Sequence, residues 1–223
     1  WANCMWLKGV VMKAHYNGLI PRNPFIQFHI SPNVKEREYL TEDELKAVMT
    51  HEFADSKLAY IRDIFIFASF TALSFVDIQE LTNDNIVEVN GEKWILSKRH
   101  KTKVAFQVKL LDIPLQIVER YRPMQKDNRI FPDLNYWSIC KPLKRMIREC
   151  GITKSISFHC SRHGFATLAL SKGMPIESVS RVLGHTNIVT TQLYAKITTQ
   201  KLDNDLTMFG DKLSKTFNGI TMS

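Results

Sequence analysis

Apolar residues recur at helical spacing along most of the chain. The strongest run covers residues 58–73, where apolar side chains dominate every turn. A capping box at Thr41 and Glu44 predicts the start of another helix, since each side chain can satisfy a backbone amide of the other residue. The remaining predicted helices are 1–20, 77–81, 114–121, 136–150, 158–172, 176–183, 188–196 and one in the tail from 198 to 223.

The apolar pattern changes from helical to strand-like spacing between residues 85 and 112. Ile86–Val89 and Trp94–Leu96 flank the pair Asn90-Gly91, which favours a two-residue hairpin turn with positive φ angles. A third strand is predicted at Val104–Leu110. The fold class is therefore mainly α with a small three-stranded antiparallel β-sheet.

The first 30 residues differ from the rest. Their helix is predicted to end at Asn17-Gly18, and Pro21–Pro32 contains three prolines and little periodicity, which predicts an extended linker. A compact domain begins near the capping box. We therefore divide the chain into residues 1–30, the end of a preceding domain plus a linker, and residues 31–223.

The net charge of the chain indicates a class of binding partner. The 223 residues include 30 Lys and Arg against 22 Asp and Glu, a net charge of +8 that favours a polyanion such as nucleic acid. No stretch approaches the length of a membrane span, so no membrane partner is expected. The four cysteines form no C-x-x-C pair, and a reduced cytoplasmic setting is expected.

Candidate chemistry gathers in the last third of the chain. His159 and Arg162 lie three residues apart near a helix N-terminus, where both can face one anionic group. Gly184 suits a left-handed helix cap that fixes the direction of His185, and Tyr194 follows nine residues later. Each residue alone has an ordinary explanation as a surface, capping or core-edge side chain. Their joint order is far more specific.

That order resembles the tyrosine recombinase family, in which H-x-x-R is followed by L-G-H and then by a tyrosine. The matching segments are His159-Cys160-Ser161-Arg162, Leu183-Gly184-His185 and Tyr194-Ala195. The resemblance covers about residues 31–223 and implies the family's catalytic-domain fold, with residues 1–30 as the end of its core-binding domain. It also implies a site-specific recombinase or integrase of a mobile element, which breaks and rejoins DNA through a 3′-phosphotyrosine link.

This chain departs from one sequence motif of the family. The family has T-G-L-R-x-x-E/D-L, whose Arg holds the scissile phosphate, whereas this chain has Thr71-Ala72-Leu73-Ser74-Phe75-Val76-Asp77. Ser74 thus stands where the Arg belongs. Asp77 matches the acidic position, where it either supports the site or simply caps a short helix. His163 resembles a second family His, and we interpret it as structural.

A basic run in the hairpin region offers a replacement cation. By similarity to the R-x-K-T form of some family members, Lys101 is assigned as the catalytic lysine. Arg99 lies two residues earlier, on the same face of a regular strand, and is our candidate substitute for the missing Arg. The alternative is that this run is a solvated basic loop that contacts DNA phosphates non-specifically.

The resemblance implies a role for each candidate. Tyr194 is the nucleophile, which needs assistance because the unperturbed pKa of a tyrosine is about 10. His159 is the base, Lys101 protonates the leaving 5′ oxygen, and the phosphate oxygens are bound by Arg99, Arg162 and His185. No metal or other cofactor is expected, since the sequence lacks D-x-D-x-D and P-loop motifs.

The expected partners are double-stranded DNA and further copies of the chain, assembled as a tetramer on paired DNA sites. Apolar residues in the tail suit a C-terminal segment exchanged between subunits, although a tail packed on its own subunit fits equally well. Two other functions stay open. One is a type IB topoisomerase, and the other is a decayed, non-enzymatic DNA-binding integrase, for which Ser74 argues.

Overall fold

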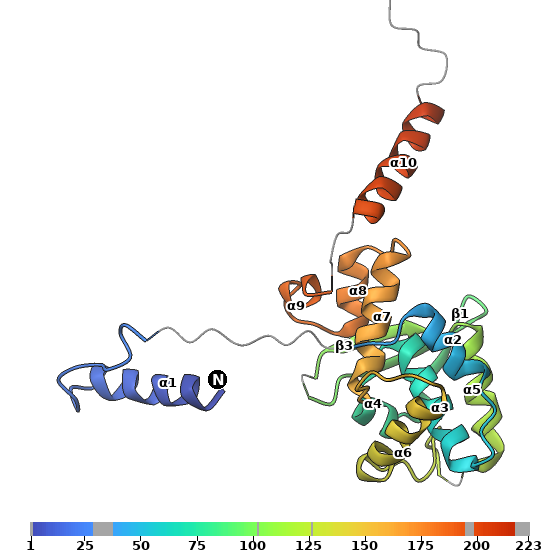
Figure 1. Ribbon diagram of the computed structural model, residues 1–223, viewed down its shortest axis with the longest axis horizontal. Helices are drawn as coiled ribbons and strands as arrows, with labels where there is room; N and C mark the ends of the chain where they lie inside the picture. Colours follow the sequence, from blue (N-terminus) through green and yellow to red (C-terminus); the bar gives the residue numbers. More distant parts are fainter. Residues whose placement is uncertain (1, 29–37, 102, 126, 195–198, 217–223) are drawn as a thin grey trace, which may run out of the picture. The chain divides into compact units, whose positions relative to one another are not determined.

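The computed structural model describes residues 2–28, 38–101, 103–125, 127–194 and 199–216. The chain separates into two units, residues 1–37 and 38–223. Its elements, shown in Figure 1, follow the order predicted from the sequence. No helix in the described ranges is long and apolar enough to cross a membrane.

The first unit contains helix α1 (Ala2–Tyr16). Gly18 ends the helix with a φ of 71°, and the backbone amide of Leu19 reaches back to the carbonyl of Ala14 at 2.9 Å. Residues 21–28 were predicted to be extended, but they form turns, because the amides of Ile26 and Phe28 donate to carbonyls three residues earlier. The rest of the predicted linker lies outside the described residues.

Helix α3 forms the centre of the second unit. It is buried on nearly all sides and contacts each of the helices α2, α5, α6 and α7. The bounds of the helices up to α6 are α2 (Glu42–Thr50), α3 (Ser56–Thr71), α4 (Phe75–Gln79), η1 (Asn83–Asn85), α5 (Asp112–Tyr121), η2 (Arg122–Met124) and α6 (Tyr136–Glu149). The capping box predicted at Thr41 and Glu44 is confirmed, with amide-to-side-chain distances of 2.7 and 3.3 Å.

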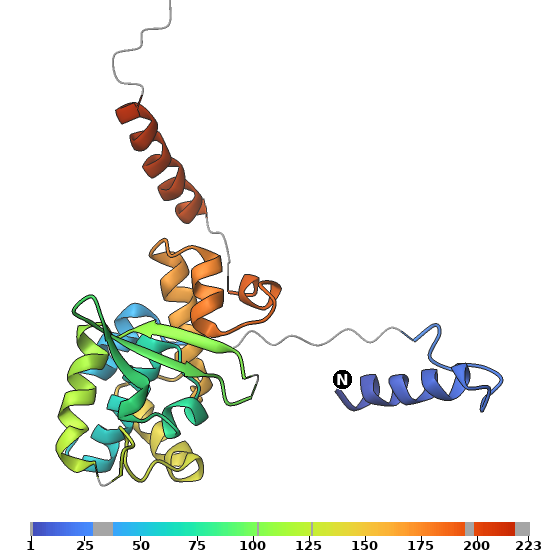
Figure 2. The same ribbon diagram turned by 180° about the vertical axis from the view of Figure 1, so that it is seen from behind.

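The three-stranded sheet has the predicted antiparallel order β1-β2-β3 and is seen from behind in Figure 2. Its strands are β1 (Ile86–Val89), β2 (Glu92–Lys98) and β3 (Ala105–Lys109). Asn90 and Gly91 have φ angles of 52° and 78°, which confirms the hairpin turn. Ile95, Phe106 and Val108 point from the sheet into the main hydrophobic core.

The C-terminal helices carry the candidate chemistry. They are α7 (His159–Ser171), α8 (Ile176–Leu183), α9 (Val189–Gln192) and α10 (Thr199–Thr216). A second, smaller core of Ala72, Ala166, Leu170, Val179 and Leu183 joins α7 and α8 to the end of α3, and Tyr194 packs against it. This small core fixes the segments that surround the candidate site.

Helix α7 starts without a side-chain cap, because the amide and hydroxyl of the preceding Ser157 both contact the sulfur of Cys160. The predicted helix 77–81 begins two residues earlier, because the hydroxyl of Ser74 caps it. The predicted helix 188–196 is described only to Tyr194, and its α-helical part is α9.

Candidate active site

The C-terminal end of α8 is the structural centre of the site. Gly184 adopts the predicted left-handed conformation with a φ of 62°. Its amide donates to the carbonyl of Arg181, and the amide of His185 donates to that of Ser180, each at 3.0 Å. This cap satisfies two of the last helical carbonyls and fixes the backbone of His185.

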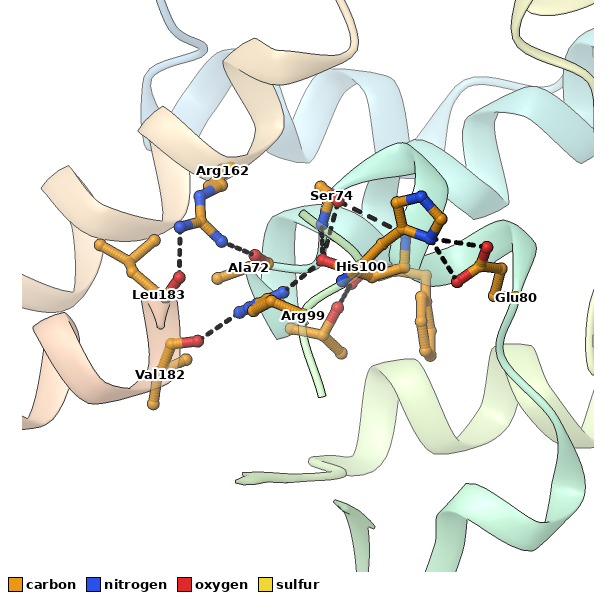
Figure 3. A network of polar contacts seen from close by, with 11 residues as sticks. Ala72, Ser74, Glu80, Arg99, His100, Arg162, Val182 and Leu183 are labelled. Carbon is orange, nitrogen blue, oxygen red and sulfur yellow. Dashed lines mark hydrogen bonds and ion pairs between the residues drawn. The ribbon is translucent and has the colours of Figure 1, made fainter. Parts of the chain in front are cut away.

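Two arginines bind the next two carbonyls of the same helix end. The Nη2 atom of Arg99 donates to the carbonyl of Val182 at 2.5 Å, and Nη2 of Arg162 donates to the carbonyl of Leu183 (Figure 3). The carbonyl end of a helix attracts cations because the helix dipole is negative there. The structure thus brings together two predicted phosphate-binding residues that lie far apart in the sequence.

Several contacts fix the side chain of Arg99. Its Nη1 atom donates to Asp77 at 2.7 Å, and its guanidinium carbon lies 4.1 Å from the centre of the Phe106 ring. A β-carbon on Gly184 would lie 2.9 Å from the Arg99 Nε, so both the φ angle and the close approach require glycine there. Only 5% of Arg99 is exposed, and its Nε has no hydrogen-bond partner among the described residues.

Asp77 is the acceptor that orients Arg99. Its Oδ2 accepts from the Ser74 hydroxyl at 2.7 Å as well as from Arg99, and its Oδ1 accepts from the amide of His100 at 3.0 Å. Burial alone would raise the pKa of Asp77, but these hydrogen bonds outweigh it and lower the pKa. The N-cap of α4 is Ser74, and Asp77 completes a capping box by accepting a hydrogen bond from the Ser74 amide at 3.3 Å, so Asp77 both caps the helix and orients Arg99.

The adjoining hairpin is also anchored to α4. His100 pairs through Nδ1 with the carboxylate of Glu80, whose nearer oxygen lies at 2.7 Å. Figure 3 shows this pair beside the Ser74 and Arg99 contacts. Ser74 thus binds the same carboxylate that holds Arg99.

Arg162 projects from the first turn of α7 and is half-buried. Its Nη1 atom donates to the carbonyl of Ala72 at 2.9 Å, at the left-handed end of α3. Burial, followed by the nearby charge of Arg99, lowers the pKa of Arg162 to about 10. The guanidinium therefore remains charged at neutral pH.

Tyr194 lies beside two histidine rings. Its ring centre is 5.0 Å from that of His163 and 6.5 Å from that of His185, with the latter pair nearly parallel at 16°. His163 in turn lies 4.7 Å from His159. His163, which the sequence pattern indicated as structural, is thus buried between the candidate base and the candidate nucleophile. Its position four residues after His159 on the same helix was the available signal.

His185 is half-buried and surrounded by positive charge. Burial, followed by the charges of Arg162, Arg99 and His159, lowers its pKa to about 4. Its Nδ1 atom lies 2.9 Å from the Oγ1 of Thr191, a residue that sequence reasoning did not identify. His185 is therefore neutral at physiological pH.

Lys101 makes no contact with this group among the described residues. Strand β2 ends at Lys98, so the predicted shared strand face of Arg99 and Lys101 is wrong. The cause is a tight loop, in which the Arg99 amide donates to the Val104 carbonyl and the Lys103 amide donates to the Arg99 carbonyl, each at 2.8 Å. Lys101 is exposed in this loop, where no hydrogen bond or ion pair to a described residue holds it.

The described residues contain no group of three His, Cys, Asp or Glu side chains placed to hold a metal ion. The polar groups that converge on the site are instead the two arginines and the imidazoles. This arrangement can bind a phosphate beside the hydroxyl of Tyr194.

Known proteins resemble the chain in both sequence and fold. Residues 38–201 match the sequence profile of the phage integrase family. The chain is 32% identical over 177 residues to the tyrosine recombinase XerA of Pyrococcus horikoshii, an alignment that covers 73% of this chain and 58% of that protein. It therefore spans little more than half the length of this relative.

Solved structures share the fold at lower identity. The integrase of the transposon Tn1549, in complex with a circular-intermediate DNA, aligns with a TM-score of 0.76 and 18% identity, covering 91% of this chain and 76% of that one. The XerH site-specific recombinase in a post-cleavage complex with its palindromic difH substrate aligns with a TM-score of 0.64 and 22% identity, covering 79% and 54%.

Proposed function

The chain belongs to the phage integrase family of tyrosine recombinases, and on this basis we propose that it cuts and rejoins double-stranded DNA through a phosphotyrosine intermediate. The observation that carries the proposal is the meeting of Arg99, Arg162 and His185 at the end of α8, beside Tyr194. These groups form a phosphate-binding site next to a nucleophile.

The reaction needs two proton transfers. The Tyr194 oxygen attacks the phosphorus and forms the 3′-phosphotyrosyl bond, while His159 accepts the phenolic proton. The bond to the 5′ oxygen breaks, and Lys101 from the hairpin loop gives that oxygen a proton. The bond energy is retained in the phosphotyrosine. Attack by a 5′ hydroxyl then reverses the step and reseals the strand without ATP.

Arg99 takes the place of the arginine missing at position 74. The contact between Arg99 and Asp77 supports this assignment, because a buried carboxylate orients the guanidinium. The Ser74 hydroxyl is already engaged with Asp77 and carries no charge to offer a phosphate.

Helix α6 supplies a DNA-contacting surface. Trp137, Lys141, Lys144 and Arg148 are exposed and recur at the spacing of one helix face, and 85% of Trp137 is accessible to solvent. Tyr136, at the start of α6, packs on Phe75 of α4 with ring centres 5.2 Å apart. The basic face therefore begins beside the helix that Ser74 caps, where it would bind backbone phosphates flanking the cleavage site.

The assembly is a tetramer on paired DNA sites, built through helix α10. Five large apolar side chains of α10 are exposed: Leu202, Leu206, Met208, Phe209 and Leu213. Such a face is covered when the helix docks on a neighbouring copy. The structural similarity to a transposon integrase favours a mobile element as the source, with the protein acting on nucleoid DNA in a bacterial cytoplasm.

A pool of nicked duplexes with a randomised core tests the function. The nick lets a short 5′-hydroxyl fragment diffuse away after cleavage, so a covalent enzyme becomes trapped on DNA that can be isolated in SDS and sequenced. We expect a trapped adduct with a defined sequence. Exchange between two such sites would distinguish a recombinase from a topoisomerase, and absence of any adduct would identify a non-enzymatic DNA-binding protein.

A further inference from the structure

Thr191 is completely buried in α9 and contacts two residues of the site. Its Oγ1 lies 2.9 Å from Nδ1 of His185, and its carbonyl accepts the backbone amide of Tyr194 at 3.0 Å. The helix cap at Gly184 already fixes the backbone of His185. Thr191 therefore determines the two features that the helix cap leaves open. These are the rotation of the His185 imidazole ring and the ring nitrogen that carries its proton.

The direction of this hydrogen bond follows from burial. A threonine hydroxyl has one proton to donate, and a buried donor without an acceptor is costly. Among the residues in the described ranges, the Thr191 hydroxyl has one side-chain partner, the Nδ1 of His185. The hydroxyl consequently donates to Nδ1, which must then be the unprotonated nitrogen of a neutral ring.

We propose that Thr191 is a positioning residue that holds His185 in the tautomer protonated on Nε2, so that this N–H is presented to the scissile phosphate. The opposite tautomer would turn a lone pair toward a phosphate oxygen and repel it. The lowered pKa of His185 is consistent with a neutral ring, for which the choice of tautomer matters. The role in phosphate binding rests on the proposed function, whereas the tautomer itself does not.

The tautomer can be measured without DNA. In protein labelled with ¹⁵N-histidine at neutral pH, nitrogen–proton correlation spectra identify which ring nitrogen carries the proton, and a His185→Gln variant assigns the His185 signals. We expect protonated Nε2 in the wild type and in Thr191→Ser, which keeps the hydroxyl. Thr191→Val, which keeps the shape but removes the hydroxyl, should shift the signals toward the Nδ1-protonated form.

Cleavage provides the second readout. Thr191→Val should reduce single-turnover cleavage about tenfold, the value of one neutral hydrogen bond, while noncovalent DNA binding stays within about twofold of wild type. Thr191→Ser should cleave within about twofold of wild type, since it retains the donor.

Either readout can overturn the proposal. A wild-type His185 that is protonated on Nδ1 contradicts it directly, even if no variant folds. Equal cleavage by the Val and Ser variants also contradicts it. If the wild-type protein traps no DNA at all, the proposed function fails, and the spectra still decide the tautomer.

Discussion

Arg99 lies so close to Gly184 that a β-carbon on the glycine would stand 2.9 Å from the arginine Nε. The same glycine ends α8 in a left-handed turn that fixes His185. One residue without a side chain therefore serves both the helix cap and the packing of the arginine. The proposed phosphate site depends on both roles of Gly184.

Gly184→Ala should consequently affect more than stability. The left-handed backbone costs an alanine about 1 kcal/mol, and displacement of Arg99 should additionally lower DNA cleavage by at least about tenfold. Gly151→Ala is a matched control, because Gly151 has a φ of 74° but nothing within 4 Å of its added β-carbon. Urea unfolding and single-turnover cleavage of both variants provide the comparison. Similar cleavage by the two would show that the contact with Arg99 is unimportant.

Arg99→Ala should slow cleavage on the order of 10²-fold, since it removes a charged donor at the phosphate. Lys98→Ala should have little effect, because Lys98 is exposed while Arg99 is buried. Ser74→Ala should be mild in rate and cost about 1 kcal/mol of stability through the lost cap. The three single-turnover rates are to be compared on the same trapped substrate. An inactive Ser74→Ala with a near-normal Arg99→Ala would reverse the assignment.

The pKa of His185 predicts a pH-dependent stability. Because the folded state lowers this pKa from 6.5 to about 4, the unfolded chain binds the proton more tightly. Stability should therefore fall as the pH drops from about 6.5 to about 4 and then level off with respect to this group. Chemical denaturation across this range should show a smaller loss for His185→Gln. Parallel curves for the two proteins would mean that His185 titrates normally.

Much of this fold could be predicted from local sequence, and the exceptions have physical causes. The apolar run of α3, the Asn90-Gly91 hairpin and the glycine end of α8 depend on neighbouring residues, and all three are confirmed. The end of β2 was missed because the Arg99–Val104 backbone contacts close a loop that no residue spacing reveals. The contacts of Arg99 with Asp77 and of His185 with Thr191 are side-chain contacts, which depend on packing in three dimensions.

Helix α10 should be needed for assembly but not for folding. Truncation after Thr199 removes the exposed apolar face, including Leu206 and Phe209, and leaves the two hydrophobic cores intact. We expect an unchanged unfolding transition, retained single-site cleavage and loss of complexes that hold two DNA sites. Sizing of protein–DNA complexes by light scattering measures this. Normal pairing of sites by the truncated protein would mean that the tail packs on its own subunit.

The identity of the covalently attached residue tests the central claim most directly. Tyr194 is half-buried beside His163 and His185, whereas Tyr121 is buried and hydrogen-bonded to Asp63 at 2.8 Å, and Tyr136 packs on Phe75. We predict that peptide mapping of the trapped adduct places the DNA on Tyr194, and that Tyr194→Phe binds DNA normally but forms no adduct. An adduct that persists in Tyr194→Phe, or that maps to Tyr121 or Tyr136, would contradict the account.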